Sequence, residues 1–404
     1  MDAATVIALP ALTDLGVAAL PPDRLNLLVS TAVGRPVQVG TLTVSPVDYP
    51  EGSIATEALM RCAGTAIDGN GECLHWRLFV KVLRAAWVWP FIELFPEFAR
   101  QQWIDEFPWR IEIDAYRSRA GELFDPGMRL VEVYDVIEID ADHAAIWMED
   151  VMPHRDGWTD AAFERAARHL GVLAARRPVG TEVVFGAPAV TARTGYAMRM
   201  FVQGRVLLGA APALRDPAGW THPVLAAVLA EQGDTSLPDD LSAALDRIEP
   251  WLAAMDALPQ TYVHGDASPQ NLLIPAPDPD TFAVIDFAFN SPQCVGFDLG
   301  QLLVGLVHAG QMPVEAMDRV RRVIVPAHVA GLRDAGLDVS EDQVERGFLL
   351  AVVLRSLFTA VPFEALGRPD TAALRDLLRQ RVALARKLLD YAAEISPEDR
   401  VKRV

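Results

Sequence analysis

The alternation of apolar and polar residues predicts β-strands in the first third of the chain. Three runs alternate from Pro36 onward, PVQVGTLTVSPV, LMRCAGTAI and LHWRLFVKVLRAA, and the turn-forming sequences DYPEGS and DGNGE separate them. Runs of this pattern, rich in β-branched residues and bounded by turn residues, are typical of antiparallel strands. We therefore expect a three-stranded antiparallel meander, a helix near DRLNLLVSTAVG before it, and two further strands at RLVEVYDVIEID and AAIWMEDV.

After residue 150 the apolar spacing changes to that of amphipathic helices. Thr159 or Asp160 is expected to cap a helix over DAAFERAARHLGVLAARR, in which apolar residues recur at i, i+3 and i+4. Later segments share this spacing: HPVLAAVLAEQG, LSAALDRIEPWLAAMDAL, PVEAMDRVRRVIVPAHVAGLRDAG, EDQVERGFLLAVVLRSLFTAV and TAALRDLLRQRVALARKLLDYAAEI. Two short strands, LLI and FAVIDF, interrupt the helices and are joined by the turn PAPDPD.

These elements predict an α+β protein with two lobes. A leader and helix over residues 1–35 precede a β-rich N-terminal lobe over 36–150, and a mainly helical C-terminal lobe covers 151–404. A chain of 404 residues, 51% hydrophobic and 22% charged, is long enough and apolar enough to build a sizeable core.

Charge and cysteine content narrow the classes of partner and compartment. The formal net charge of −18 disfavours nucleic acid or an anionic membrane as a partner. It is compatible with a cationic small molecule, although an ordinary acidic surface explains the charge more simply. The three cysteines form neither a metal-binding spacing nor a disulfide framework. No apolar run approaches the ~18 residues of a transmembrane helix, and the amino terminus lacks a basic signal-peptide region, so we expect a cytoplasmic protein.

Candidate catalytic residues gather in the stretch TYVHGDASPQNLLIPAPDPDTFAVIDF. The triplet H-G-D ends at Asp266, Asn271 follows five residues later, and Asp286 lies in the apolar run FAVIDF. Phosphoryl transfer needs one carboxylate that orients the acceptor hydroxyl and takes its proton, together with oxygen ligands for Mg²⁺. Asp266 suits the first role, and Asn271 and Asp286 suit the second. Each residue alone would be an ordinary loop residue, but their joint order and spacing favour a kinase-type site.

This order and spacing resemble the catalytic set of protein kinases, and the H-G-D and I-D-F forms resemble those of aminoglycoside phosphotransferases and related small-molecule kinases. The resemblance implies a protein-kinase-like fold, ATP and Mg²⁺ as cofactors, and a catalytic role for Asp266. We expect His264 to have a structural role in packing the catalytic loop rather than to act as an acid or base. Asp298 in FDLG matches a family aspartate that braces this loop; Asp298 could also cap the helix over LGQLLVGLV, and both roles could hold.

Lys81 is the only lysine in the first 386 residues of a chain that has 36 basic residues. It lies in the predicted strand segment FVKVL, where a buried ammonium group needs a partner. The resemblance implies that Lys81 contacts the α- and β-phosphates of ATP and pairs with Glu112 in WRIEIDAYRS, which is similar to the family segment R-E-x-x-x-Y. Asp114 is a less favoured partner, and a solvated helix face is the alternative interpretation of Glu112.

Two further segments are assigned to the nucleotide by the resemblance alone. The loop DYPEGSIAT lies where kinases cover the phosphates and offers Gly52, Ser53 and Thr56. It lacks G-x-G-x-x-G, and an ordinary hairpin turn is the alternative. The chain at MEDV matches the kinase hinge, where backbone groups of Glu149 and Val151 would bind adenine.

The favoured function is ATP-dependent phosphorylation of a hydroxyl group on a small molecule, with Asp266 and Lys81 as the catalytic residues. Within this class, antibiotic resistance by phosphorylation of an aminoglycoside or other antibiotic is one option, and housekeeping phosphorylation of a sugar, amino sugar or choline-type molecule is another. We expect acceptor-recognising residues on the helices after Gly300. A nucleotide-binding regulator with the same fold and no turnover is the alternative from a different class.

Overall fold

The computed structural model describes residues 10–48, 53–118, 120–154, 157–180 and 193–395. They form two compact units. The N-terminal unit comprises Met1–Ala120 and Leu130–Pro153, and the C-terminal unit comprises Gly121–Arg129 and His154–Val404. Among the described residues, no helix is both long enough and apolar enough to cross a membrane.

The N-terminal unit is built on one antiparallel sheet with the strand order β1-β3-β4-β7-β6, in which β2 also pairs with β3. Its strands are β1 (Val37–Val39), β2 (Thr43–Pro46), β3 (Thr56–Asp68), β4 (Cys73–Arg84), β6 (Val133–Glu138) and β7 (His143–Glu149). The expected β-rich lobe is therefore confirmed, and its two later strands, β6 and β7, lie where the alternation predicted them.

The prediction of one continuous strand over PVQVGTLTVSPV is wrong, because the chain bends in the middle of this segment and forms two strands, β1 and β2. The N–H groups of Gly40 and Thr41 both donate to the carbonyl oxygen of Thr65, which interrupts the ladder between β1 and β2. The bend brings the Thr41 carbonyl against Gly64, where a Cβ atom would lie only 1.9 Å from the Thr41 oxygen. Glycine at position 64 thus permits the close crossing that divides the strand.

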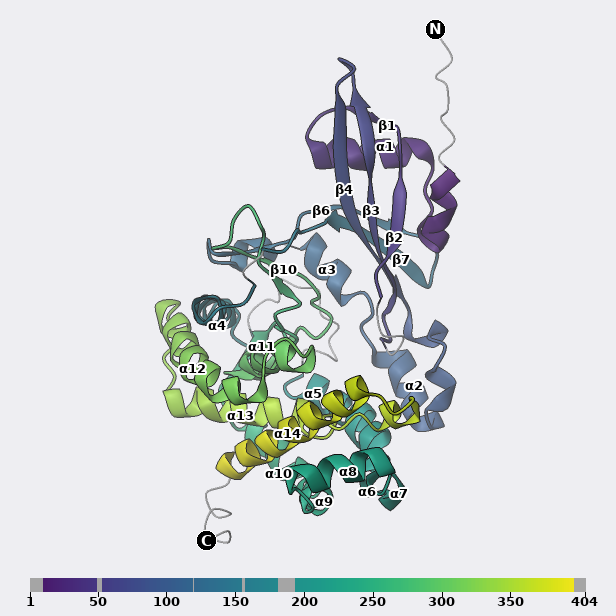
Figure 1. Cartoon of the computed structure of the whole chain (residues 1–404). Helices are drawn as coiled ribbons and strands as arrows, with labels where there is room; N and C mark the ends of the chain where they lie inside the picture. The colour runs from purple at the N-terminus through teal and green to yellow at the C-terminus, as the bar shows by residue number, and fades with distance from the viewer. Residues whose placement is uncertain (1–9, 49–52, 119, 155–156, 181–192, 396–404) are drawn as a thin grey trace. The chain divides into compact units, whose positions relative to one another are not determined.

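Helix α1 (Pro22–Val33) covers one face of this sheet, as Figure 1 shows across β1, β3 and β4. It begins with proline in its first turn and ends at Gly34, which adopts the left-handed conformation typical of a C-terminal cap. Its buried side chains, Leu25, Leu28 and Val29, join the sheet residues in one core cluster. The helix expected near DRLNLLVSTAVG is confirmed, and it belongs to the same compact unit as the sheet.

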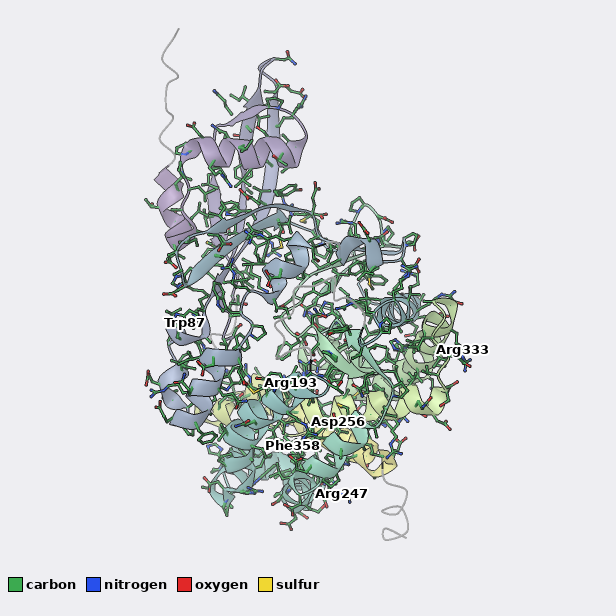
Figure 2. The ribbon with its side chains drawn as sticks, turned by 180° about the vertical axis from the view of Figure 1, so that it is seen from behind. Trp87, Arg193, Arg247, Asp256, Arg333 and Phe358 are labelled. Carbon is green, nitrogen blue, oxygen red and sulfur yellow. The ribbon has the colours of Figure 1, made fainter. Side chains whose placement is uncertain are left out.

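An aromatic segment connects β4 to the helix that carries Glu112. It contains η2 (Ala86–Val88), η3 (Ile92–Leu94), α2 (Glu97–Glu106), α3 (Ile111–Arg117) and η4 (Ala120–Leu123). Trp87, labelled in Figure 2, donates its indole N–H to Asp142 Oδ1 at 2.8 Å, which ties this segment to the turn before β7. Glu112 lies on the buried face of α3.

The C-terminal unit is mainly helical, as expected. Its helical elements are α4 (Asp160–Ala175), α5 (Tyr196–Phe201), the π-helical η5 (Val202–Ala210), α6 (Ala211–Arg215), α7 (Pro217–Trp220), α8 (Pro223–Gln232), α9 (Leu237–Leu245), α10 (Ile248–Asp256), α11 (Phe297–His308), η6 (Val314–Ala316), α12 (Met317–Asp334), α13 (Glu341–Ser356), η7 (Phe363–Gly367) and α14 (Ala372–Ile395). Thr159 caps α4 by accepting the N–H of Ala162 at 3.3 Å. The predicted helix LSAALDRIEPWLAAMDAL divides into α9 and α10 because Pro250 cannot donate within a helix interior.

Short strands and two packed helices position the catalytic stretch. β8 (Gln260–Val263) pairs with β11 (Ser291–Cys294), and β10 (Phe282–Val284) lies between β5 (Met128–Leu130) and β9 (Leu272–Leu273). Helix α13 packs closely against the segment that leads into α11. A Cβ atom on Gly347 would lie 2.0 Å from the carbonyl oxygen of Val295, so glycine is required at position 347.

Candidate active site

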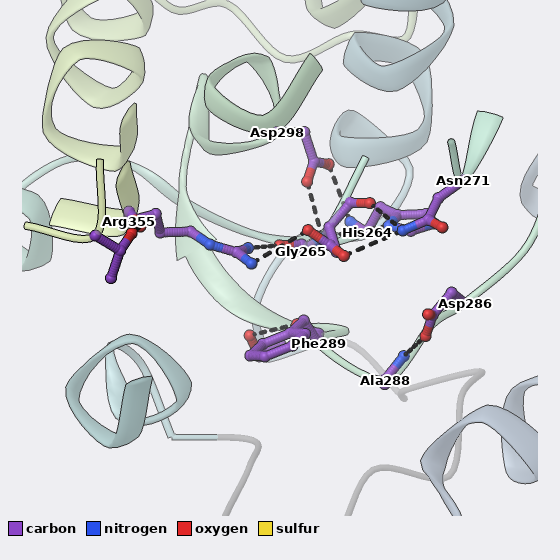
Figure 3. Close-up of polar contacts among 11 residues, drawn as sticks. His264, Gly265, Asn271, Asp286, Ala288, Phe289, Asp298 and Arg355 are labelled. Carbon is purple, nitrogen blue, oxygen red and sulfur yellow. Dashed lines mark hydrogen bonds and ion pairs between the residues drawn. The ribbon is translucent and has the colours of Figure 1, made fainter. Parts of the chain in front are cut away.

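The catalytic loop begins directly after β8, and Asp298 of α11 holds its backbone. The two carboxylate oxygens of Asp298 accept the N–H groups of His264 at 2.9 Å and Gly265 at 2.8 Å. Asp298 is 2% exposed, and Figure 3 shows its carboxylate pointing toward these two residues. Gly296 occupies the N-cap position of α11, where no side chain forms a capping hydrogen bond. The interpretation of Asp298 as a brace for the loop is therefore confirmed over the helix-cap alternative.

Gly265 allows the loop to turn. Its φ angle is +88°, in the left-handed region that favours glycine, and a Cβ atom there would lie 2.1 Å from the Phe289 carbonyl oxygen. Any side chain at position 265 would therefore displace the backbone next to Asp266.

His264 is fully buried and serves the loop rather than a ligand. Its Nε2 lies 2.9 Å from the carbonyl oxygen of Ile285, and its Nδ1 lies 3.2 Å from the N–H of Asp266. Because a carbonyl can only accept and a backbone N–H can only donate, Nε2 donates to Ile285 and Nδ1 accepts from Asp266. The ring also packs on Phe287 at a centroid distance of 4.7 Å. Both nitrogens are engaged, which agrees with the structural role expected for His264.

Asn271 and Asp266 are brought together by a tight turn in the loop. Ser268 N–H donates to Asp266 O at 2.7 Å, and Asn271 N–H donates to Ser268 O at 2.9 Å. The Nδ2 group of Asn271 then donates to the carbonyl oxygen of Asp266 at 2.8 Å and to its Oδ2 at 3.1 Å. The amide nitrogen is thereby engaged with Asp266, and the Oδ1 atom of Asn271 is the group that can serve as an oxygen ligand.

Asp286 lies at the same end of the β9–β10 hairpin as Asn271. The antiparallel register pairs Val284 with Leu272, and Ile285 N–H continues it by donating to Asn271 O at 3.0 Å. Asp286 follows with φ +61°, the single positive φ of a non-glycine residue in the described part of the chain. Such backbone strain is concentrated at functional sites, because it persists only where the surroundings enforce it.

Asn271 and Asp286 fit a Mg²⁺ ion that is shared with a nucleotide. Mg²⁺ prefers hard oxygen donors and is usually held by one or two protein groups, with waters and phosphate oxygens completing the octahedron. Within the described ranges, no cluster of three or more His, Cys, Asp or Glu side chains forms an all-protein metal cage. One amide oxygen and one carboxylate match the nucleotide-dependent type of site.

In the N-terminal unit, Lys81 of β4 forms a buried ion pair with Glu112 of α3. The Lys81 Nζ and Glu112 Oε2 atoms are 2.6 Å apart, and the side chains are 8% and 2% exposed. Tyr116 donates its hydroxyl to Glu112 Oε1 at 3.1 Å, so the Glu and Tyr of the R-E-x-x-x-Y segment contact each other. The partner is thus Glu112 rather than Asp114, and the alternative of a solvated helix face for Glu112 is wrong.

The loop assigned to the phosphates is only partly described, and Gly52 lies outside the described residues. Ser53 Oγ accepts the N–H of Thr56 at 3.1 Å, which leaves its hydroxyl proton available for another acceptor. Thr56 is buried and is the first residue of β3 rather than a member of the loop. Arg84, which no sequence pattern singled out, donates to Ser53 O at 2.8 Å and to Ile54 O at 3.1 Å.

The segment after β7 provides the groups expected at a nucleotide hinge. Glu149 N–H already donates to Glu132 O at 2.8 Å, so this N–H is not available to an adenine ring. For Val151, neither backbone group has a hydrogen-bond partner among the residues that the structure describes. Between them, the Asp150 carboxylate accepts from Arg61 at 3.1 Å and from Arg77 at 2.9 Å, which fixes this segment to the sheet.

Sequence reasoning missed Arg355 of α13, which contacts the catalytic loop. Its guanidinium donates to the Gly265 carbonyl oxygen and to Asp266 Oδ1, the latter at 3.1 Å (Figure 3). The one available signal was an arginine inside the apolar run GFLLAVVLRSLFTAV, where a buried charge needs a partner. Spacing alone could not have named Asp266 as that partner.

Comparison with known proteins locates the resemblance in this part of the chain. Residues 204–322 match the model of the phosphotransferase enzyme family, and this segment contains all the elements from β8 to α11. The match confirms the family resemblance that the H-G-D stretch indicates, and it supports a small-molecule phosphotransferase. No curated protein matches the chain.

Solved structures with a similar arrangement share little sequence with this chain. An amicoumacin kinase in complex with AMP-PNP, Ca²⁺ and amicoumacin aligns with 88% of this chain and 90% of its own at 12% identity and a TM-score of 0.48. An aminoglycoside phosphotransferase from Streptomyces rimosus aligns over 82% and 97% at 15% identity and a TM-score of 0.39. A choline kinase from Cryptosporidium parvum aligns over 89% and 90% at 10% identity and a TM-score of 0.43.

Proposed function

We propose that the protein transfers the γ-phosphate of ATP to a hydroxyl group of a small molecule. The observation that carries the proposal is the contact of Asn271 Nδ2 with Asp266, at 2.8 Å to its carbonyl oxygen and 3.1 Å to Oδ2. This contact fixes the carboxylate and leaves the amide oxygen of Asn271 as the group that could serve as a metal ligand, and Asp286 lies at the same end of the β9–β10 hairpin. An acceptor-orienting base and two metal ligands are the parts that phosphoryl transfer requires.

Each unit would contribute different groups. In the C-terminal unit, Asp266 orients the acceptor hydroxyl and takes its proton, while Asn271 and Asp286 hold Mg²⁺. When bound, Mg²⁺ neutralises charge on the β- and γ-phosphates. In the N-terminal unit, Lys81 is kept in place by Glu112 to contact the α- and β-phosphates. Ser53 would donate to a phosphate oxygen.

The hinge would bind adenine through the carbonyl of Glu149 and the N–H of Val151. Those two groups suit the paired acceptor and donor edge of an adenine ring, and the ion pairs of Asp150 hold the segment still. For the acceptor we propose an aminoglycoside or other antibiotic, an amino sugar or a related molecule. The net charge of −18 favours an acceptor that carries positive charge.

A coupled ADP-release screen tests the proposal. Purified protein with Mg²⁺ and ATP is offered aminoglycosides, other hydroxylated antibiotics, sugars, amino sugars and choline, and products are weighed by mass spectrometry. We expect acceptor-dependent ADP release with a mass increase of one phosphoryl group, abolished in Asp266→Asn. ATP binding without ADP release for any acceptor would contradict the proposal and support a nucleotide-binding regulator without turnover.

A further inference from the structure

We propose that Arg355 is a positioning residue for Asp266, and that transfer depends on its guanidinium fork. This inference rests on the proposed function of Asp266. One terminal nitrogen of Arg355 donates to the Gly265 carbonyl oxygen and the other donates to Asp266 Oδ1 at 3.1 Å. A single planar group therefore fixes the backbone and the carboxylate of consecutive loop residues. Lysine, with one compact ammonium group, cannot reproduce this fork.

The two oxygens of the Asp266 carboxylate are held from opposite sides of the loop. Oδ1 accepts from Arg355 and Oδ2 accepts from Asn271 Nδ2 at 3.1 Å. Rotation of the carboxylate about its Cα–Cβ or Cβ–Cγ bond would break one or both contacts. Because the Asp266 side chain is still 27% exposed, it keeps an accessible face for an acceptor hydroxyl. Arg355 thus restricts the orientation of Asp266 without covering it.

Arg355 is itself held rigidly by aromatic rings. Its guanidinium carbon lies 4.9 Å from the ring centroid of Phe289, 5.2 Å from that of Phe201 and 5.9 Å from that of Phe297. These rings come from α5, from the segment before β11 and from the start of α11. Cations are attracted to aromatic faces at such distances. These three rings, here called the aromatic box, therefore hold the guanidinium in the position from which it donates both hydrogen bonds.

The positive charge of Arg355 is buried and is stabilised by nearby carboxylates. Its side chain is 8% exposed, and burial lowers the pKa of its guanidinium, while the carboxylates of Asp266 and Asp298 oppose this change. Asp298 of α11 binds the N–H groups of the loop, and Arg355 of α13 binds its carbonyl and carboxylate oxygens. The two helices pack directly against each other.

Two substitutions of Arg355 test whether it positions Asp266 for the reaction. Arg355→Met keeps a long, unbranched side chain but removes both hydrogen-bond donors. We expect kcat to fall by ~10²-fold, the size of effect seen when a reacting group is misplaced by about 1 Å. In Arg355→Lys one of the two contacts can be kept, and kcat should fall by ~10-fold. The Kd for Mg·ATP should stay within about twofold of wild type in both, because among the described residues Arg355 forms no hydrogen bond or ion pair with a residue assigned to the nucleotide or the metal.

Arg321→Met is the matched control. Arg321 of α12 is also a part-buried arginine that binds two acidic side chains, Glu345 at 2.8 Å and Glu394 at 2.7 Å, and lies over the rings of Phe348 and Tyr391. Its loss should lower thermal stability of the C-terminal unit while leaving kcat of the folded protein within about twofold of wild type. Equal losses of kcat in the Arg321 and Arg355 variants would overturn the proposal.

Chemical rescue supplies a readout that a purely structural contact would not move. In Arg355→Ala the aromatic box remains, so added guanidinium or methylguanidinium ions should restore part of kcat, whereas ammonium or tetramethylammonium ions should not. Crystals of Arg355→Met with Mg²⁺ and AMP-PNP should show the Asp266 carboxylate rotated from its wild-type orientation. If wild-type protein transfers phosphate to no acceptor, the proposed function fails, and this carboxylate orientation alone decides the role of Arg355. An unmoved Asp266 in the Met variant would overturn that role.

Discussion

Asp298→Asn is the substitution whose effect follows most directly from the geometry of the loop. The carboxylate of Asp298 accepts two backbone N–H groups, from His264 at 2.9 Å and from Gly265 at 2.8 Å. An asparagine has nearly the same shape, so no cavity forms, but its amide can accept at only one end. Its NH₂ group would face one of the two loop N–H groups, donor against donor.

The expected cost can be worked out bond by bond. A hydrogen bond to a charged group contributes about 1.5–3 kcal/mol, and one of the two is lost while a buried N–H is left without an acceptor. The other becomes a neutral bond, weaker by about 1 kcal/mol. The loop in Asp298→Asn should therefore be less stable by about 3 kcal/mol, which corresponds to a ~10²-fold increase in local opening at 1.36 kcal/mol per factor of ten.

Amide hydrogen exchange measured by mass spectrometry on peptides that contain residues 261–267 tests this value. We expect exchange to accelerate by ~10²-fold in Asp298→Asn, and kcat to fall by at least ~10-fold because Asp266 is carried by the loosened loop. Asp256→Asn is the control, since Asp256 (Figure 2) forms a partly exposed ion pair with Arg199 at 2.5 Å, worth at most about 1 kcal/mol. Exchange in Asp298→Asn within about threefold of wild type would refute the reasoning.

Three other substitutions or conditions give distinct outcomes. Asp266→Asn should reduce kcat by at least ~10², the lower range for removal of a general base, with ATP affinity nearly unchanged in a calorimetric titration; wild-type turnover would remove Asp266 from its role. Lys81→Arg should keep the charge but lose most of kcat, since a broad planar guanidinium cannot take the place of a compact ammonium between the Glu112 carboxylate and the phosphates, and full kcat would make Lys81 an ordinary strand residue. Burial lowers the pKa of His308 and of His328 to about 4, below the unfolded value of about 6.5, so the neutral rings stabilise the fold above pH 6.5 and this stability is lost as the pH falls toward 4. Urea midpoints measured across that range should fall with pH, and less steeply in His308→Gln; a midpoint independent of pH would contradict the assignment.

The parts of the site that lie close together in the sequence were predictable from spacing. Asp266, Asn271 and Asp286 fall within one loop and one hairpin, so their order along the chain nearly determines their order in space. Lys81 was identifiable because the chain otherwise uses arginine for its positive charges over its first 386 residues. Its partner Glu112 followed from the family pattern, and the buried 2.6 Å contact agrees with it.

The parts that depend on packing between distant segments were not predictable. Arg355 is 89 residues from Asp266, and their contact requires α13 to lie against the start of α11, which depends on Gly347. The division of the first strand depends on the close crossing of Thr41 over Gly64. Arg84 donates to the backbone carbonyls of Ser53 and Ile54. The periodicity of the sequence carries no sign of this contact.

The claim that residues 264–286 form a metal-dependent phosphoryl-transfer site is tested most directly by the Mg²⁺ dependence of ATP binding in Asp286→Asn. Asparagine is chosen because it tolerates the φ of +61° better than alanine, so the variant should fold normally. Asp280→Ala, at the opposite end of the same hairpin, is the control. We predict that Mg²⁺ tightens ATP binding in the wild type and in Asp280→Ala, and that this tightening is largely lost in Asp286→Asn. An unchanged Mg²⁺ dependence in Asp286→Asn would contradict the assignment of this stretch as the metal-dependent site.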